Sequence, residues 1–166
     1  MAPVCPLDAG GPVEEEEAMA ISVLLVDDEE VFVQTLAKRL TLRRFNVYTA
    51  TRKERVFESL RNNLIDVVLL DVRMPDLDGI EATQDIKVAY PLIEVILLTG
   101  HASMEASLEG LKRGAFDYLL KPVNIDELVY KIEDAYRKKG LQEEKIRRLE
   151  DRSDPAADEA ESGASD

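Results

Sequence analysis

The sequence of 166 residues has little of what several classes of protein need. It contains one cysteine and one histidine and no tryptophan, so neither a disulfide framework nor a cysteine–histidine zinc site is available. The one cysteine, Cys5, lies before every patterned segment and is interpreted as an incidental thiol. No apolar run approaches the roughly 20 residues of a membrane helix, and the N-terminus lacks a signal-peptide pattern. A cytoplasmic protein without membrane association is therefore expected.

Basic charge is also scarce, and the acidic excess is unevenly distributed. The formal net charge is −13. The first 20 residues hold five acidic residues and no basic one, and residues 141–166 hold nine acidic and four basic ones. The centre, residues 21–140, is nearly balanced and offers no stripe of Lys and Arg for phosphate contacts. Direct binding of nucleic acid is therefore not expected.

Composition divides the chain into a patterned centre and two low-complexity ends. Residues 1–19 are predicted to form a disordered acidic leader, and residues 153–166 a disordered acidic tail. Met19 directly precedes the patterned region and is an alternative start. Residues 20–140 are predicted to form one domain. Residues 141–152 are a candidate helical extension with Glu–Arg pairs four residues apart, for which a solvated helix is favoured over a dimer or partner contact.

Five short apolar runs alternate with amphipathic stretches along the centre of the chain. The runs are Ile21–Val26, Asn46–Ala50, Asp66–Leu70, Val95–Leu98 and Asp117–Leu120. The second and fifth runs are weaker than the other three, whose continuous hydrophobicity is typical of parallel strands that are buried on both faces. The stretches after the runs carry apolar side chains at helical spacing, as in Phe32, Leu36 and Leu40. Strands and helices that alternate five times predict an α/β domain with a doubly wound parallel sheet.

Helix boundaries are predicted from glycine and charge. The fourth helix is expected to carry Leu108 on its inward face and to stop at Gly114. The fifth helix is expected to open at Asp126 and to stop at the Lys–Lys–Gly sequence of residues 138–140.

Ligands of an open α/β sheet bind outside the carboxyl ends of its strands. Five polar side chains follow the predicted strands at that edge: Asp27, Asp28, Asp71, Thr99 and Lys121. An aspartate after a strand is more often a helix cap than a ligand, so each residue alone carries little weight. Capping does not explain all five together, and we expect these side chains to form one site.

The chemistry of such a site follows from its charges. Three converging carboxylates repel one another unless a cation lies among them. Oxygen ligands that leave room for water favour Mg²⁺ over Ca²⁺. A carboxylate beside Mg²⁺, with a lysine and a hydroxyl close to the same oxygens, is an arrangement that accepts a phosphoryl group. The carboxylate attacks, while the metal and the ammonium group neutralise the charge on the phosphoryl oxygens.

The segments VLLVDDEE, VVLLDVRMPDLDGIE, VILLTGH and GAFDYLLKPVNIDEL resemble the receiver domain of response regulators in two-component signalling, in its single-domain, chemotaxis-receiver-like form. The resemblance spans about residues 21–139. It implies a flavodoxin-like sheet of five parallel strands in the order 2-1-3-4-5 with five helices. It also implies a signalling switch of a phosphorelay that takes a phosphoryl group from a histidine kinase or phosphotransfer protein. The sequence FDYLLKP before NIDEL is similar to receivers of the nitrogen-regulatory type.

The resemblance implies the following metal and acceptor residues. Asp71 is the phosphoacceptor. Asp27, Asp28 and Asp71 hold Mg²⁺, together with the backbone carbonyl of Arg73. The Lys121–Pro122 peptide bond is expected to be cis, which proline makes accessible.

The resemblance also implies residues that bind or respond to the phosphoryl group. Thr99 hydrogen-bonds this group, Lys121 pairs with it, and Tyr118 occupies the aromatic switch position. Arg73 and His101 occupy positions that modulate the phosphoryl lifetime, although an exposed loop residue explains His101 equally well.

Two other functions remain open at this point. A phosphatase of the haloacid-dehalogenase type also uses an aspartate nucleophile with Mg²⁺, but it needs an acid two residues later, where this chain has Arg73. A pure interaction module would use its aspartates only as helix caps. The 26 residues after Gly140 are too few for a DNA-binding helix-turn-helix domain. We therefore expect either a stand-alone receiver read by a partner protein, which the low-complexity acidic ending favours, or a fragment of a longer protein.

Overall fold

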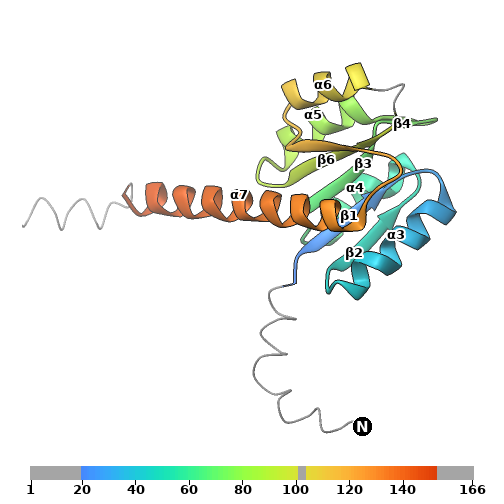
Figure 1. Cartoon of the computed structure of the whole chain (residues 1–166). Helices are drawn as coiled ribbons and strands as arrows, with labels where there is room; N and C mark the ends of the chain where they lie inside the picture. Colours follow the sequence, from blue (N-terminus) through green and yellow to red (C-terminus); the bar gives the residue numbers. More distant parts are fainter. Residues whose placement is uncertain (1–19, 101–103, 153–166) are drawn as a thin grey trace, which may run out of the picture.

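The computed structural model describes residues 20–100 and 104–152, so the predictions for the leader, the tail and His101 lie outside the described residues. Five parallel strands form one sheet in the order β2-β1-β3-β6-β7 (Figure 1). The strands are β1 (Ser22–Val26), β2 (Asn46–Ala50), β3 (Val67–Asp71), β6 (Glu94–Thr99) and β7 (Asp117–Leu120). Counted along the chain, this is the order 2-1-3-4-5, and the predicted doubly wound sheet is confirmed.

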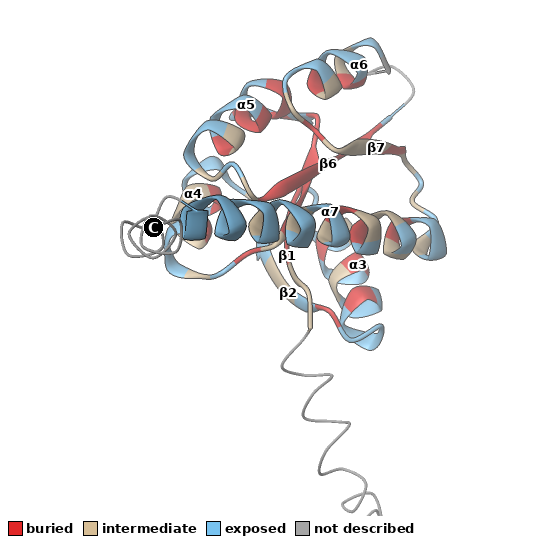
Figure 2. Ribbon diagram, turned by 90° about the vertical axis from the view of Figure 1, so that its left-hand side faces the viewer, coloured by how far each residue is buried: buried red, intermediate tan, exposed pale blue. Residues whose placement is uncertain are grey.

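Helices cover both faces of the sheet (Figures 1 and 2). The helices are α3 (Glu30–Leu42), α4 (Lys53–Asn62), α5 (Gly79–Ala89), α6 (Met104–Lys112) and α7 (Ile125–Arg152). Buried side chains of α3 and α7 pack into one core cluster, and those of α4 and α5 pack into the other, which α6 also contacts. No helix among the described residues is long and apolar enough to cross a membrane.

The inner strands are mainly apolar because they contribute to both core clusters. On β3, Val68 and Leu70 face the cluster beneath α4 and α5, whereas Val67 and Leu69 face the cluster beneath α3 and α7. All four side chains are fully buried. This alternation explains the continuous hydrophobic runs in the sequence.

Two predictions about the helices are wrong. Leu108 is 51% exposed, because α6 approaches the sheet through small residues instead: Ser107 and Gly110 are buried, and a Cβ added at Gly110 would collide with Leu97. The stop predicted at residues 138–140 does not occur either, since α7 continues to Arg152.

Two other local predictions are confirmed. Gly114, which follows α6, has a φ of +114°, a left-handed conformation that favours glycine. The Lys121–Pro122 peptide bond is cis.

Candidate functional site at the carboxyl edge of the sheet

Three aspartates meet where β1 and β3 end. Asp27 and Asp28 directly follow β1, and Asp71 is the last residue of β3. The two strands are parallel neighbours with Val26 opposite Leu70, so their carboxyl ends lie side by side. One carboxylate oxygen from each aspartate lies within 4.8 Å of the others. We refer to these three residues and Lys121 as the acidic edge.

The three carboxylates differ in their surroundings. Asp27 is fully buried and Asp71 is 8% exposed, whereas Asp28 is exposed. Asp27 Oδ1 accepts the backbone N–H of Glu29 at 3.0 Å in the turn before α3, a helix that has no side-chain N-cap. Its other oxygen, Oδ2, accepts a hydrogen bond from Lys121, so this local turn accounts for only part of the side chain.

Lys121 brings one positive charge to the acidic edge from the loop after β7. Its Nζ lies 2.6 Å from Asp27 Oδ2 and 3.6 Å from Asp71 Oδ1, and 4.6 Å from the centre of the Phe32 ring. Burial lowers the pKa of Lys121, but the hydrogen bond to Asp27 and the charge of Asp71 outweigh it and raise the pKa above its usual value. The ammonium group is therefore charged and held by carboxylates.

The pKa of Asp71 is raised at this edge. Burial, reinforced by the charge of Asp27, raises its pKa from 3.8 to about 6, although Lys121 acts in the opposite direction. One lysine thus does not compensate three carboxylates. An added cation would lower the repulsion, and an all-oxygen ligand set suits a hard ion such as Mg²⁺.

The predicted switch residues lie on the two neighbouring strands. Thr99 ends β6, one residue beyond the partner of Asp71, and its hydroxyl donates to the Gly100 carbonyl at 3.0 Å. It is 1% exposed. Tyr118 lies on β7 opposite Leu97 and is half-buried against the cluster beneath α4 and α5. The structure therefore places Thr99 at the same edge of the sheet as Asp71, with Tyr118 on the adjacent strand.

The loop after Asp71 has more structure than the sequence indicated. Strands β4 (Arg73–Met74) and β5 (Leu77–Asp78) form a short antiparallel hairpin. The backbone N–H of Arg73 donates to Asp71 Oδ1 at 3.4 Å. The turn of the hairpin carries Asp76, whose Oδ2 accepts the backbone N–H of Lys53 at the start of α4 at 3.0 Å. Sequence reasoning missed this cap because its two partners lie 23 residues apart.

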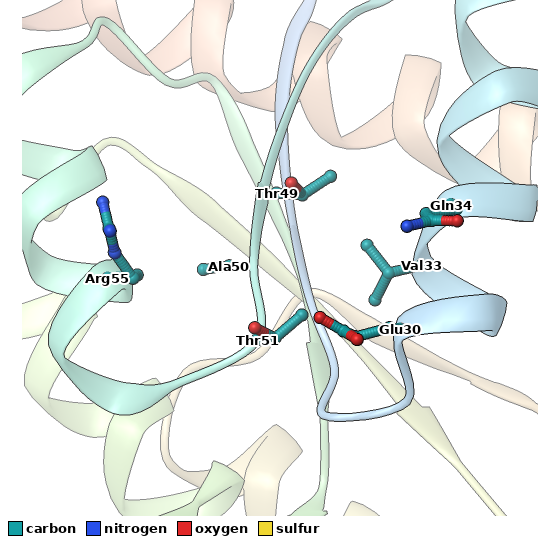
Figure 3. A pocket seen from close by; sticks show the side chains of 7 residues that line it. All are labelled: Glu30, Val33, Gln34, Thr49, Ala50, Thr51 and Arg55. Carbon is teal, nitrogen blue, oxygen red and sulfur yellow. The ribbon is translucent and has the colours of Figure 1, made fainter.

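Three hollows among the described residues lie near the acidic edge, and the three aspartates line none of them. A cavity of about 260 Å³ lies between α3 and α4 and is lined by Glu30, Val33, Gln34, Thr49, Ala50, Thr51 and Arg55 (Figure 3). A larger, mainly apolar hollow of about 470 Å³ lies beside Lys121 and is lined in part by Phe32, Leu36, Pro122 and Val123. The third, of about 550 Å³, lies over the β4–β5 hairpin and is lined in part by Arg73, Asp76 and Ala106.

A five-stranded, doubly wound sheet with three aspartates and a lysine at its carboxyl edge defines a flavodoxin-like signalling domain. The model of the response regulator receiver domain matches residues 23–133. The chain therefore belongs to this family, whose members are signalling switches, and the resemblance seen in the sequence is confirmed.

Known relatives and structures agree with this assignment. The chain is 38% identical over 115 residues to the transcriptional regulatory protein ZraR of Escherichia coli (69% of this chain, 26% of ZraR). It is 36% identical over 113 residues to the DNA-binding transcriptional regulator NtrC of the same species (68% and 24%). It thus spans about a quarter of these relatives. A receiver-domain structure from Clostridium thermocellum is 35% identical, with a TM-score of 0.70 over 74% of this chain and 98% of that one.

Proposed function

We propose that this chain is a phosphoacceptor receiver of a two-component phosphorelay. Asp71 takes a phosphoryl group from a histidine kinase or phosphotransfer protein, and the modified surface is read by a partner protein. The observation that carries this proposal is the acidic edge, where three carboxylates approach within 4.8 Å and Lys121 Nζ lies 3.6 Å from Asp71. Such a surplus of negative charge favours a bound metal and a lysine-assisted reaction.

The residues present fit Mg²⁺. Asp27, Asp28 and Asp71 would hold it together with the backbone carbonyl of Arg73. Two of the three carboxylates are buried and one is exposed, so the ligand set has an open side where water and a phosphoryl donor can enter. When bound, the metal supplies positive charge for the phosphoryl oxygens.

The chain's own residues perform the transfer. An oxygen of ionised Asp71 attacks phosphorus, the phosphorus–nitrogen bond of the phosphohistidine donor breaks, and the imidazole keeps the electron pair. A pKa of about 6 leaves Asp71 mostly ionised at pH 7 and above. Lys121, which now binds Asp27 at 2.6 Å, is close enough to turn its ammonium group toward the new phosphoryl oxygens.

Phosphorylation would change the surface through Thr99 and Tyr118. The Thr99 hydroxyl donates to the Gly100 carbonyl, and a dianionic phosphoryl group on Asp71 is a stronger acceptor. Movement of Thr99 toward it would leave space for Tyr118 to turn inward and would reshape the surface formed by α6, β7 and α7. This is a local charge change that shifts a two-state equilibrium. Arg73 and His101 are proposed to modulate the phosphoryl lifetime.

The acceptor can be tested by phosphotransfer. The chain is incubated with a panel of phosphorylated histidine kinases, with and without Mg²⁺, and the product is located by mass spectrometry. One phosphoryl group on Asp71 is expected, with no product from Asp71→Asn or without metal. Asp85→Asn, which changes an exposed aspartate on α5, is the matched control. Labelling of Asp71→Asn would refute the assignment, and turnover of a phosphate monoester would revive the phosphatase.

The switch needs a separate measurement. Beryllofluoride with Mg²⁺ mimics the phosphoryl group, and NMR chemical shifts report the response of each residue. Large changes are expected around Thr99 and Tyr118. Unchanged signals there, with binding confirmed at Asp71, would contradict the proposed switch. The cytoplasmic location and the absence of direct nucleic-acid binding stay predictions.

A further inference from the structure

Helix α7 has a weak point where it leaves the domain. Its first half buries Leu128, Ile132 and Ala135 against the sheet, but residues 141–152 project beyond the domain (Figures 1 and 2) and are exposed except for half-buried Glu143. A helical segment of this length is only marginally stable in water on its own. Gly140, at the junction, is a poor helix former. The continuity of the helix therefore needs a physical cause.

Lys139 connects the two sides of this junction. Its side chain is only 14% exposed, and its Nζ lies 3.1 Å from Asp66 Oδ1 and 2.9 Å from Glu143 Oε2. Asp66 directly precedes β3, and its other oxygen accepts the backbone N–H of Ser22 in β1 at 2.8 Å. Glu143 lies on the far side of Gly140. One ammonium group thus joins the sheet to the projecting part of the helix.

The neighbouring lysine provides a second attachment. Lys138 Nζ lies 3.5 Å from Oε1 of Glu94, the buried first residue of β6, and 5.7 Å from the centre of the Phe116 ring. Because β3 and β6 are adjacent strands, the two lysines fix the last packed turn of α7 at two points of the sheet. Two attachments restrict the direction of a helix as well as its position.

The balance of forces on Lys139 supports a persistent bridge. Burial lowers the pKa of Lys139, but the hydrogen bonds to Glu143 and Asp66 outweigh it and raise the pKa. The ammonium group therefore stays charged at neutral pH. A partly buried ion pair is also screened by salt less than an exposed one.

We propose that Lys139 locks α7 across Gly140, so that residues 141–152 form a rigid arm whose direction is set by the amino ends of β1 and β3. The twelve residues of the arm extend it by about 18 Å at the helical rise per residue. Without the bridge, Gly140 becomes a joint and the arm frays. The lock lies at the opposite end of the sheet from the acidic edge, so this inference does not rest on phosphorylation.

Hydrogen exchange on the full chain tests the lock. Lys139→Met keeps the length of the side chain but removes its charge. We expect amide exchange within residues 142–152 to rise about tenfold, which corresponds to about 1.4 kcal/mol, with no change in β1 and β3. Lys145→Met, which changes an exposed lysine on the arm itself, is the matched control and should leave exchange unaltered.

A second variant separates the lock from general stability. A Cβ added at Gly140 meets nothing within 4 Å, so Gly140→Ala strengthens the helix without a new contact. Added to Lys139→Met, it should restore most of the protection. Unchanged exchange of the arm in Lys139→Met, or an equal rise in the strands, would overturn the proposal. If that variant does not fold, Glu143→Gln removes the exposed half of the bridge and must give the same selective fraying.

Discussion

The two ends of the sheet both combine lysines with carboxylates, but with opposite charge balance. At the carboxyl end, Asp27, Asp28 and Asp71 lie together beside one ammonium group, that of Lys121, which pairs with Asp27 and Asp71. Burial and mutual repulsion raise the pKa of Asp71 to about 6. This end therefore has negative charge that the described residues leave only partly compensated.

At the amino end, lysines outnumber carboxylates. Buried Glu94 lies between Lys87 Nζ at 3.7 Å and Lys138 Nζ at 3.5 Å. Lys139 lies beside Asp66. We refer to these five residues as the basal cluster. Among the described residues, Glu94 Oε1 is a buried side-chain oxygen without a hydrogen bond, so the charge of Lys138, whose Nζ lies 3.5 Å away, provides its main compensation.

The difference separates a reactive site from a structural one. A compensated cluster lowers the energy of one arrangement and so holds elements together. An uncompensated cluster raises the free energy of the folded state. A bound cation would lower it again, and such perturbed groups are typical of reactive sites. The same residue types thus have different roles because their numbers differ.

The largest expected effect is at the basal cluster. Glu94→Ala should lower the free energy of unfolding by about 3 kcal/mol, because it leaves a cavity and deprives Lys87 and Lys138 of their partner. Urea denaturation measures this loss. Glu94→Gln keeps the volume and should cost less. A loss below about 0.5 kcal/mol for Glu94→Ala would show that the cluster does not hold these elements together.

At the acidic edge, removal of a charged side chain should raise the free energy of unfolding instead of lowering it. In metal-free buffer at pH 7.5, Asp71→Asn is expected to stabilise the fold by about 2 kcal/mol, because it removes a buried charge that is repelled by Asp27. The pKa of Asp71 is about 6 in the folded chain against 3.8 ordinarily. The folded state therefore binds the proton more tightly, and stability falls as the pH rises from about 4 to about 6.

The pH dependence of this stabilisation provides the control. At pH 4, Asp71 is protonated in the folded state and already partly protonated in the unfolded state, so most of the advantage of Asp71→Asn should disappear. Mg²⁺ should stabilise the unaltered chain by about 2.7 kcal/mol at a hundredfold excess over its dissociation constant, and the variant by much less. An advantage that persists unchanged at pH 4 would mean that charge is not its cause.

Sequence alone predicted the acidic edge because its geometry depends on short-range patterns. Each strand is a continuous apolar run, and parallel neighbouring strands bring the residues after them to one edge. Asp27 and Asp71 are therefore placed by the ends of β1 and β3. The basal cluster offers no such pattern. Glu94 and Lys138 lie in different elements, and only packing of α7 on the sheet brings them together.

The errors in the helices have a similar cause. Gly140 has the local character of a helix stop, and tertiary contacts of Lys139 accompany its continuation. Leu108 fits an inward helical spacing, but small residues on the next face of α6 allow closer packing and turn it outward. In both places contacts between distant segments override the local preference.

The smallest expected effect is at Asp76, which lies on the loop of the acidic edge but outside its cluster. Helix α4 begins after Arg52, which provides no side-chain cap, and Asp76 Oδ2 accepts the Lys53 N–H instead. Asp76→Ala should cost about 1 kcal/mol, the usual value of a helix cap, and speed hydrogen exchange in the first turn of α4. Asp76→Asn keeps an acceptor and should cost less, and Asp85→Ala is the exposed control. Stabilisation by Asp76→Ala would instead place this aspartate within the uncompensated charge, and the boundary of the acidic edge would have to be redrawn.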